Sequence, residues 1–70
     1  METPEFSIIV PVFNSEDTLK ELFQRTKEVM TSLGSAFEMI FVDDNSEDKS
    51  WEVLELLKKN YPNQIIAIRL

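Results

Sequence analysis

The chain has 70 residues, a net charge of −6 at pH 7, and neither cysteine nor histidine. This length allows one small domain, which buries roughly 60% of the surface that its unfolded chain exposes. The missing residue types exclude disulfides, thiol nucleophiles, imidazole bases and the usual zinc sites, so any chemistry has to use carboxylates, amides, hydroxyls or the backbone. The acidic balance argues against nucleic acid as the main partner, because that partner needs a basic face.

No apolar run approaches the ~20 residues of a membrane span, and residues 1–5 lack the pattern of a signal peptide. We therefore expect a cytoplasmic location and no membrane segment in this chain. Residues 1–5 are predicted to form a disordered tail, and residues 6–70 the folded part.

A first strand is predicted from residue 6 to residue 10. These residues are almost all apolar and β-branched, which is typical of a strand that is covered on both faces. Pro11 should end the strand, because proline cannot donate to the hydrogen-bond ladder.

A helix is predicted next, capped by Asn14 or Ser15 and with the acidic residues 16 and 17 in its first turn. Gly34, the only glycine, is expected to end this helix in a left-handed conformation. Apolar side chains recur at three- and four-residue intervals and predict one buried stripe: Leu19, Leu22, Phe23, Thr26, Val29, Met30 and Leu33.

The second predicted strand, residues 37–42, runs directly into two carboxylates, Asp43 and Asp44. A second helix should follow, capped by Ser46 or Asp48 and stopped before Pro62. Its predicted buried side chains are Trp51, Leu54, Leu57 and Tyr61, with Val53 and Leu56 beside them. Residues 64–70 are predicted to form a third strand.

The alternation of strands and helices predicts an α/β fold of the β-α-β-α-β type. Short connections between these elements favour a parallel three-stranded sheet in the order 3-2-1, with both helices on one face. The strands nevertheless carry apolar residues at consecutive positions, so they need cover on both faces. We therefore expect the chain to be the first part of a larger α/β domain, truncated after its third strand, and to self-associate through its bare face.

Two motifs, SIIVPVFN at residues 7–14 and FVDDNSEDKS at residues 41–50, carry a resemblance to a known family. Together they resemble the opening of the family-2-type nucleotide-sugar glycosyltransferases, in which the first strand ends in Pro-Val-Tyr-Asn and the second in Val-Asp-Asp-Gly-Ser. Residues 51–54 and 66–70 are similar to the branch that transfers sugars to polyprenyl phosphates, such as the dolichol-phosphate mannose synthases. The resemblance implies that residues 6–70 are the N-terminal, nucleotide-binding half of a Rossmann-like domain with the glycosyltransferase A-type fold.

The same resemblance implies roles for individual residues. Pro11 and Phe13 would line the pocket for the base and ribose, with Phe13 in place of the family's usual tyrosine. Asp44 would accept a hydrogen bond from an N–H on the base edge, with Val42 nearby, and Asp43 would support the loop or the nucleotide less directly. Further candidates for nucleotide binding are Ser15, Glu16 and Ser46.

The implied function is an inverting glycosyltransferase that moves a sugar from a UDP- or GDP-sugar to an acceptor, with a polyprenyl phosphate as the candidate. The family's Asp-x-Asp metal motif and its catalytic base have no counterpart in this chain. We therefore expect the chain to hold no catalytic residue and no metal ligand, and to be inactive alone. The full-length enzyme would use Mn²⁺ or Mg²⁺ and could lie at the cytoplasmic face of a membrane.

Two other interpretations stay open at this stage. The acidic pair Asp43-Asp44 could be a solvated, helix-capping turn in a plain interaction module. The chain could also be a receiver-like signalling domain, whose acidic cluster takes phosphate and metal. Such domains normally place the acidic pair after the first strand and an acceptor aspartate after the third, whereas here the third strand ends in Arg69-Leu70.

Overall fold

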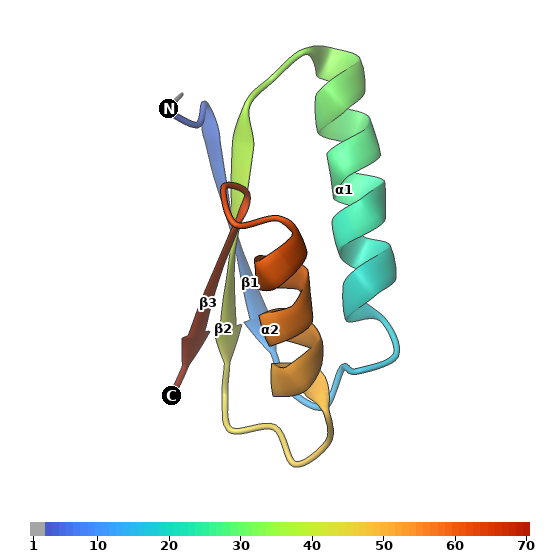
Figure 1. The fold of residues 1–70 in the computed structure, drawn as a ribbon, viewed down its shortest axis with the longest axis vertical. Helices are drawn as coiled ribbons and strands as arrows, with labels where there is room; N and C mark the ends of the chain where they lie inside the picture. The colour runs from blue at the N-terminus through green and yellow to red at the C-terminus, as the bar shows by residue number, and fades with distance from the viewer. Residues whose placement is uncertain (1–2) are drawn as a thin grey trace.

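The computed structural model describes residues 3–70, which form three parallel strands and two helices (Figure 1). In chain order these are β1 (Phe6–Val12), α1 (Leu19–Leu33), β2 (Phe37–Asp43), α2 (Ser50–Asn60) and β3 (Ile65–Arg69). The sheet order is β1-β2-β3, and both helices cover the same face of the sheet (Figure 1). The predicted α/β fold and strand order are therefore confirmed. Of the predicted tail, residues 1–2 lie outside the described residues, while the Glu5 N–H donates to the Ala36 carbonyl oxygen at 2.9 Å.

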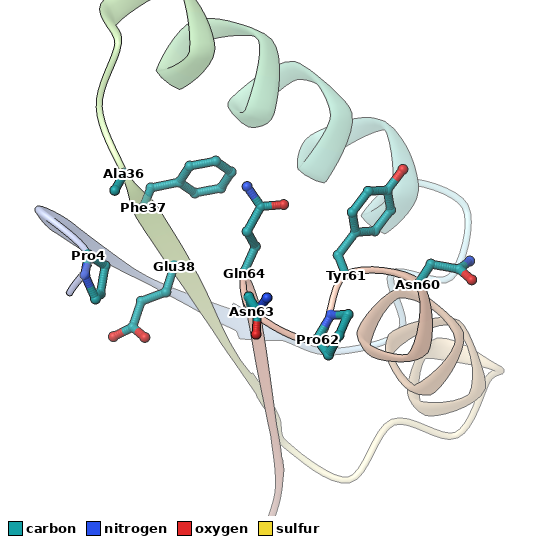
Figure 2. A pocket seen from close by; sticks show the side chains of 9 residues that line it. All are labelled: Pro4, Ala36, Phe37, Glu38, Asn60, Tyr61, Pro62, Asn63 and Gln64. Atoms are coloured by element: carbon teal, nitrogen blue, oxygen red, sulfur yellow. The ribbon is translucent and has the colours of Figure 1, made fainter. Parts of the chain in front are cut away.

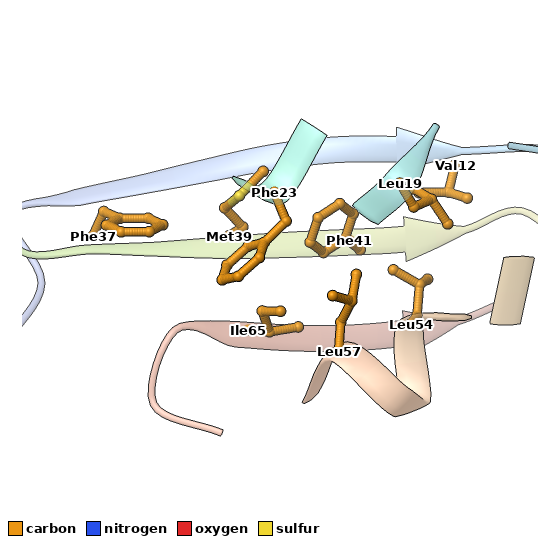
Figure 3. Close-up of a cluster of buried hydrophobic side chains, with 9 residues drawn as sticks. All are labelled: Val12, Leu19, Phe23, Phe37, Met39, Phe41, Leu54, Leu57 and Ile65. Carbon is orange, nitrogen blue, oxygen red and sulfur yellow. The ribbon is translucent and has the colours of Figure 1, made fainter. Parts of the chain in front are cut away.

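The core lies between the two helices and the covered face of the sheet (Figure 3). Every second residue of β2 is buried, beginning with Phe37 and ending with Asp43. The parallel register places Val12 beside Asp43 and Ile65 beside Met39, so neighbouring strands direct their buried side chains to the same face. The buried apolar residues of this core are Val12, Leu19, Phe23, Phe37, Met39, Phe41, Leu54, Leu57 and Ile65.

The opposite face of the sheet carries exposed apolar side chains. Ile9, Ile66 and Ile68 alternate with the inward-facing residues of their strands, and they are 69%, 39% and 44% exposed. Ile40 and Val42 of the central strand are half-buried between them. The strands therefore carry apolar residues on both faces, as predicted, and within residues 3–70 only one face is covered. We refer to these five residues as the bare face.

Pro11 lies inside β1 and does not end it, so this prediction is wrong. The N–H of Phe6 donates to the Ala36 carbonyl oxygen, and the N–H of Asp44 donates to the Val12 carbonyl oxygen. Alternate residues from Phe6 to Val12 therefore direct their peptide groups toward β2. Pro11 belongs to the other set, so its missing N–H faces the open edge of β1 and no ladder bond is lost.

α1 begins at Leu19, later than predicted. Residues 15–18 form a turn closed by a hydrogen bond from the Thr18 N–H to the Ser15 carbonyl oxygen at 3.1 Å, and this turn contains the acidic residues 16 and 17. Thr18 is the N-cap residue and makes no side-chain capping bond. Asn14 does not cap α1 either, because its side chain bonds the β2–α2 loop instead. The helix ends at Gly34 with a φ of 67°, as predicted.

The predicted apolar stripe of α1 divides into two rows. Leu19 and Phe23 are buried and Met30 packs against the core. The second row consists of Leu22, Val29 and Leu33, and it lies beside the first on the helix surface. These side chains are 40%, 56% and 67% exposed. The prediction is wrong for this second row, because the sheet covers only a narrow strip of the helix surface.

α2 follows the prediction more closely. It begins at Ser50, whose N–H donates to the Asp48 carboxylate at 2.9 Å, so Asp48 rather than Ser46 binds the first amide of the helix. Leu54 and Leu57 are buried as expected, whereas Leu56 is 60% exposed. Within residues 3–70, neither helix combines the length and the hydropathy that a bilayer span requires.

Candidate functional site

The carboxyl ends of the three strands point to one end of the sheet, where the β1–α1 and β2–α2 loops emerge (Figure 1). Val12 and Asp43 are paired in the register, so Phe13 and Asp44 follow at adjacent points. The Asp44 N–H donates to the Val12 carbonyl oxygen at 2.9 Å, which extends the pairing of β1 with β2 past the end of β2. Phe13 and Asp44 are both exposed. This end of an open α/β sheet, which we call the rim, is where such folds place their ligands.

Asp43 is a buried carboxylate beneath the rim, with 0% of its surface exposed. Its Oδ1 accepts hydrogen bonds from the Ser46 N–H, at 3.2 Å, and from the Ser46 hydroxyl. Its Oδ2 is buried without a hydrogen-bond partner among the described residues. Leaving a buried acceptor unpaired costs about 1–3 kcal/mol, so a bound donor at Oδ2 would be favourable.

Asp48 forms a second carboxylate–serine pair in the same loop. Its Oδ1 accepts hydrogen bonds from the Ser50 hydroxyl at 2.6 Å and from the Ser50 N–H at 2.9 Å. Its Oδ2 accepts from the Glu16 N–H at 3.1 Å. Partial desolvation acts to raise the pKa of Asp48, but the hydrogen bonds from Ser50 and Glu16 together outweigh it and hold the pKa below its usual 3.8. Asp48 is therefore ionised at neutral pH.

Five hydrogen bonds join residues 14–16 of the β1–α1 loop to residues 46–50 of the β2–α2 loop and the start of α2. They are Asn14 N–H to Ser46 Oγ (3.0 Å), Ser15 N–H to Ser50 Oγ (2.8 Å), Glu16 N–H to Asp48 Oδ2 (3.1 Å), and Glu47 N–H (2.8 Å) and Asp48 N–H (3.4 Å) to Asn14 Oδ1. The main-chain donors of residues 14, 15 and 16 are all engaged in these bonds, so they do not form an open cradle for a phosphate group. The two loops form one unit.

The structure brings most of the predicted site residues to this rim. Phe13 and Asp44 lie at the strand ends, and the further candidates Ser15, Glu16 and Ser46 lie in the joined loops. Pro11 and Val42 are paired in the register one residue before Val12 and Asp43, and they therefore lie on the face of the sheet opposite the helices.

Three residues that join the loops were not predicted to do so: Asn14, Asp48 and Ser50. Short polar residues after each strand were visible in the sequence. Local capping explains such residues equally well, so the sequence carried no signal that distinguished a cap from a bond between loops.

The acidic residues of the rim are spread out along the two loops. Within residues 3–70, no three acidic side chains come close enough together to hold a metal ion. The carboxylates of Asp43 and Asp48 are engaged with Ser46 and Ser50 instead.

A half-open cavity of about 540 Å³ lies at the other end of the sheet (Figure 2). Its walls come from the start of β2 and from the α2–β3 connection, and include Phe37, Tyr61 and Gln64. None of the predicted site residues lines this cavity. The rim is more open than this cavity. Both helices lie on one face of the sheet and β1 is an edge strand, so residues 3–70 border the rim on the helix side only.

Comparison with known proteins agrees with this geometry. Residues 7–70 match the Glycosyl transferase family 2. The chain belongs to glycosyl transferase family 2. This membership confirms the resemblance seen in the two motifs and disfavours the receiver-like interpretation.

The family 2 chain is similar to sugar transferases that act on polyprenyl phosphates. It is 41% identical over 64 residues to the undecaprenyl-phosphate 4-deoxy-4-formamido-L-arabinose transferase of Pseudomonas paraeruginosa, an alignment that covers 91% of this chain and 19% of the relative. Proteins of the same name from Edwardsiella ictaluri and Salmonella paratyphi B are 36% and 38% identical, with 20% of each relative covered. The family 2 chain thus spans about one fifth of the length of these relatives.

Proposed function

We propose that this chain is the nucleoside-binding part of an inverting glycosyltransferase, which transfers a sugar from a nucleotide-activated donor to a polyprenyl phosphate. The observation that carries the proposal is the placement of Phe13 and Asp44 at adjacent points of the rim, in a chain that belongs to glycosyl transferase family 2. The names of the relatives support the choice of acceptor class.

In this proposal, Asp44 accepts a hydrogen bond from an N–H of the base, and the ring of Phe13 packs on the base or ribose. An exposed carboxylate is a strong acceptor, and an aromatic ring can pack on any base because every base has a π-face. Pro11 and Val42 line the adjacent strand ends. Asp43 supports the loop that carries Asp44 through its hydrogen bonds to Ser46.

The phosphates of the donor are expected to lie away from this rim. The N–H groups of residues 14–16 are already engaged, and the nearby carboxylates of Glu16, Glu47 and Asp48 repel a diphosphate. The divalent metal expected to neutralise the leaving nucleoside diphosphate would take its ligands from other parts of the full-length enzyme.

A polyprenyl phosphate acceptor is already ionised at neutral pH. One of its oxygens attacks the anomeric carbon of the donor sugar and forms a new C–O bond, while the bond to the nucleoside diphosphate breaks and the leaving group keeps the electron pair. This step removes no proton, so it requires no general base. We expect no turnover by residues 1–70 alone, because their rim supplies only the nucleoside contacts. A cytoplasmic location, with the full-length enzyme at the cytoplasmic face of a membrane, stays a prediction.

We also infer that isolated copies of the chain associate through the bare face. Ile9, Ile40 and Ile66 are paired in register across the three strands of this face, and monomeric proteins rarely leave large apolar surfaces uncovered. The open edge of β1 lies beside this surface and offers unpaired peptide groups to another strand.

Titration of the isotope-labelled chain with UDP and GDP, with and without Mg²⁺, tests the proposed nucleoside site. Amide shifts should cluster at residues 12–14 and 42–46, and Asp44→Ala should abolish them. Uridine or guanosine should produce the same pattern as the diphosphates, because the rim is expected to bind the nucleoside end. Shifts confined to the cavity around Tyr61 would contradict the proposal.

A further inference from the structure

The joined loops contain two matching hydrogen-bond chains. In the first, the Ser46 hydroxyl donates to the buried Asp43 and accepts from the N–H of Asn14 at 3.0 Å. In the second, the Ser50 hydroxyl donates to Asp48 at 2.6 Å and accepts from the N–H of residue 15 at 2.8 Å. In each chain a carboxylate oxygen accepts from the serine hydroxyl, and the serine oxygen in turn receives a main-chain N–H from the opposite loop.

Asn14 adds a third connection through its side chain. Its Oδ1 accepts hydrogen bonds from the N–H of Glu47 at 2.8 Å and from the N–H of Asp48 at 3.4 Å. The residue is held at a φ of 47°, in the left-handed region that asparagine tolerates better than most residues. Asn14 directly follows Phe13, and Glu47 lies three residues after Asp44. The side chain therefore connects the two segments that carry the proposed nucleoside contacts.

We propose that Asn14 is a positioning residue of the nucleoside site. By bonding the β2–α2 loop through its side-chain oxygen, it holds Phe13 at a fixed separation from Asp44 before any ligand arrives. This inference rests on the proposed function. Loops that are already ordered lose less conformational entropy on binding, so nucleotide affinity depends on Asn14 although Asn14 does not touch the nucleotide.

The test compares Asn14→Gly with Asn45→Gly. Both asparagines are exposed and have positive φ, 47° and 55°, and glycine adopts this backbone conformation without strain. Asn14 bonds the opposite loop through its side chain, whereas none of the side-chain hydrogen bonds found within residues 3–70 involves Asn45. Both substitutions remove a side-chain amide, but only Asn14→Gly removes an amide oxygen that joins the two loops.

Two measurements are made on each variant of the 70-residue chain. The first is the affinity for UDP and GDP, from amide shifts at nucleotide concentrations in the millimolar range. The second is hydrogen exchange at the Glu47 amide without nucleotide. Asn14→Gly should speed exchange at Glu47 and weaken nucleotide binding by on the order of tenfold, because hydrogen bonds that order the site are lost. The amide of Phe41 in the core should keep its protection, which separates positioning from a general loss of stability. Asn45→Gly should leave both measurements unchanged.

Two results would overturn the assignment of Asn14 while leaving the proposed function in place. One is equal nucleotide affinity in the two variants, and the other is unchanged exchange at Glu47 in Asn14→Gly. A complete lack of nucleotide-dependent shifts in the unaltered chain is a different outcome, because it overturns the nucleoside site itself and the role of Asn14 with it.

Discussion

The N–H of Asp44 donates to the carbonyl oxygen of Val12 at 2.9 Å, so the first residue after β2 is held against the last residue of β1. Phe13 directly follows Val12, and the carboxylate and the aromatic ring therefore emerge from neighbouring points of the rim. Parallel strands bring their carboxyl ends to the same edge of a sheet, and this hydrogen bond extends that alignment by one residue. The nucleoside site proposed above uses both side chains.

Asp44→Asn should weaken nucleotide binding without unfolding the chain. The substitution keeps the shape of the side chain but removes the charge that strengthens its hydrogen bond to a base N–H, so we expect a loss of about tenfold or more in affinity. Amide-shift titration with UDP and GDP measures the affinity of each variant. The matched control is Asp17→Asn, which makes the same change at another exposed aspartate and should retain the original affinity. Equal losses in both variants would indicate a general effect of charge.

Phe13→Ala should also weaken nucleotide binding, because packing of a base on an aromatic ring contributes about 1–3 kcal/mol. Phe13 is 59% exposed, so its loss should change the free energy of unfolding by no more than about 0.5 kcal/mol. Phe6, which is 48% exposed at the other end of β1, provides the control. Phe6→Ala should leave affinity unchanged, and a weaker affinity in that variant would contradict the location of the site.

Acid should weaken the stabilisation that Asp48 provides. The hydrogen bonds from Ser50 and Glu16 hold the folded-state pKa of Asp48 below the usual 3.8, so the unfolded chain binds the proton more tightly. The contribution of Asp48 is therefore fully present above the usual pKa and is lost as the pH falls through the lower folded-state pKa. Urea unfolding of the unaltered chain and of Asp48→Asn should give free energies of unfolding that differ at pH 7 and converge as the pH falls below 3.8. A difference that grows in acid would contradict this sign.

Phe41→Ala should destabilise the whole chain. Phe41 is fully buried in the central strand beneath both helices, and removing such a side chain costs about 3–5 kcal/mol (Figure 3). Small domains have a total stability near the lower end of about 5–15 kcal/mol, so a large unfolded population is expected. Urea unfolding followed by the fluorescence of Trp51, the only tryptophan, measures the loss. Val29→Ala, at a position 56% exposed on α1, should change stability by less than about 0.5 kcal/mol.

Ile9→Lys should prevent the self-association inferred above. Ile9 is 69% exposed on the bare face, so a monomer can accommodate lysine there, whereas a second copy would have to bury its charge. Sedimentation of the unaltered chain should depend on concentration, and association should strengthen with salt because copies of charge −6 repel each other. Val29→Lys makes the same charge change on α1 and should associate normally. A stable, folded monomer of the unaltered chain at high concentration would refute the inference.

The element order and the strand order could be predicted because both depend on local pattern. Runs of apolar residues, the spacing along each helix and the position of Gly34 are properties of neighbours in the chain, and the structure confirms them. The rim position of Phe13 and Asp44 follows from the same reasoning, since Phe13 lies three residues and Asp44 two residues after the end of a predicted strand. The exposure of Leu22, Val29 and Leu33 could not be predicted, because periodicity identifies an apolar side of a helix but not the width of the surface that covers it.

The sequence by itself determined which residues form strands and helices, and which polar residues stand at the strand ends. Only the tertiary structure decided that the backbone nitrogen of Pro11, which carries no hydrogen, faces the open edge of β1. It also decided that the Asn14 side chain bonds the β2–α2 loop instead of capping a helix. The reason is physical. The partners of Asn14 lie 32 to 34 residues away along the chain, and only the parallel pairing of β1 with β2 brings these groups within hydrogen-bonding distance.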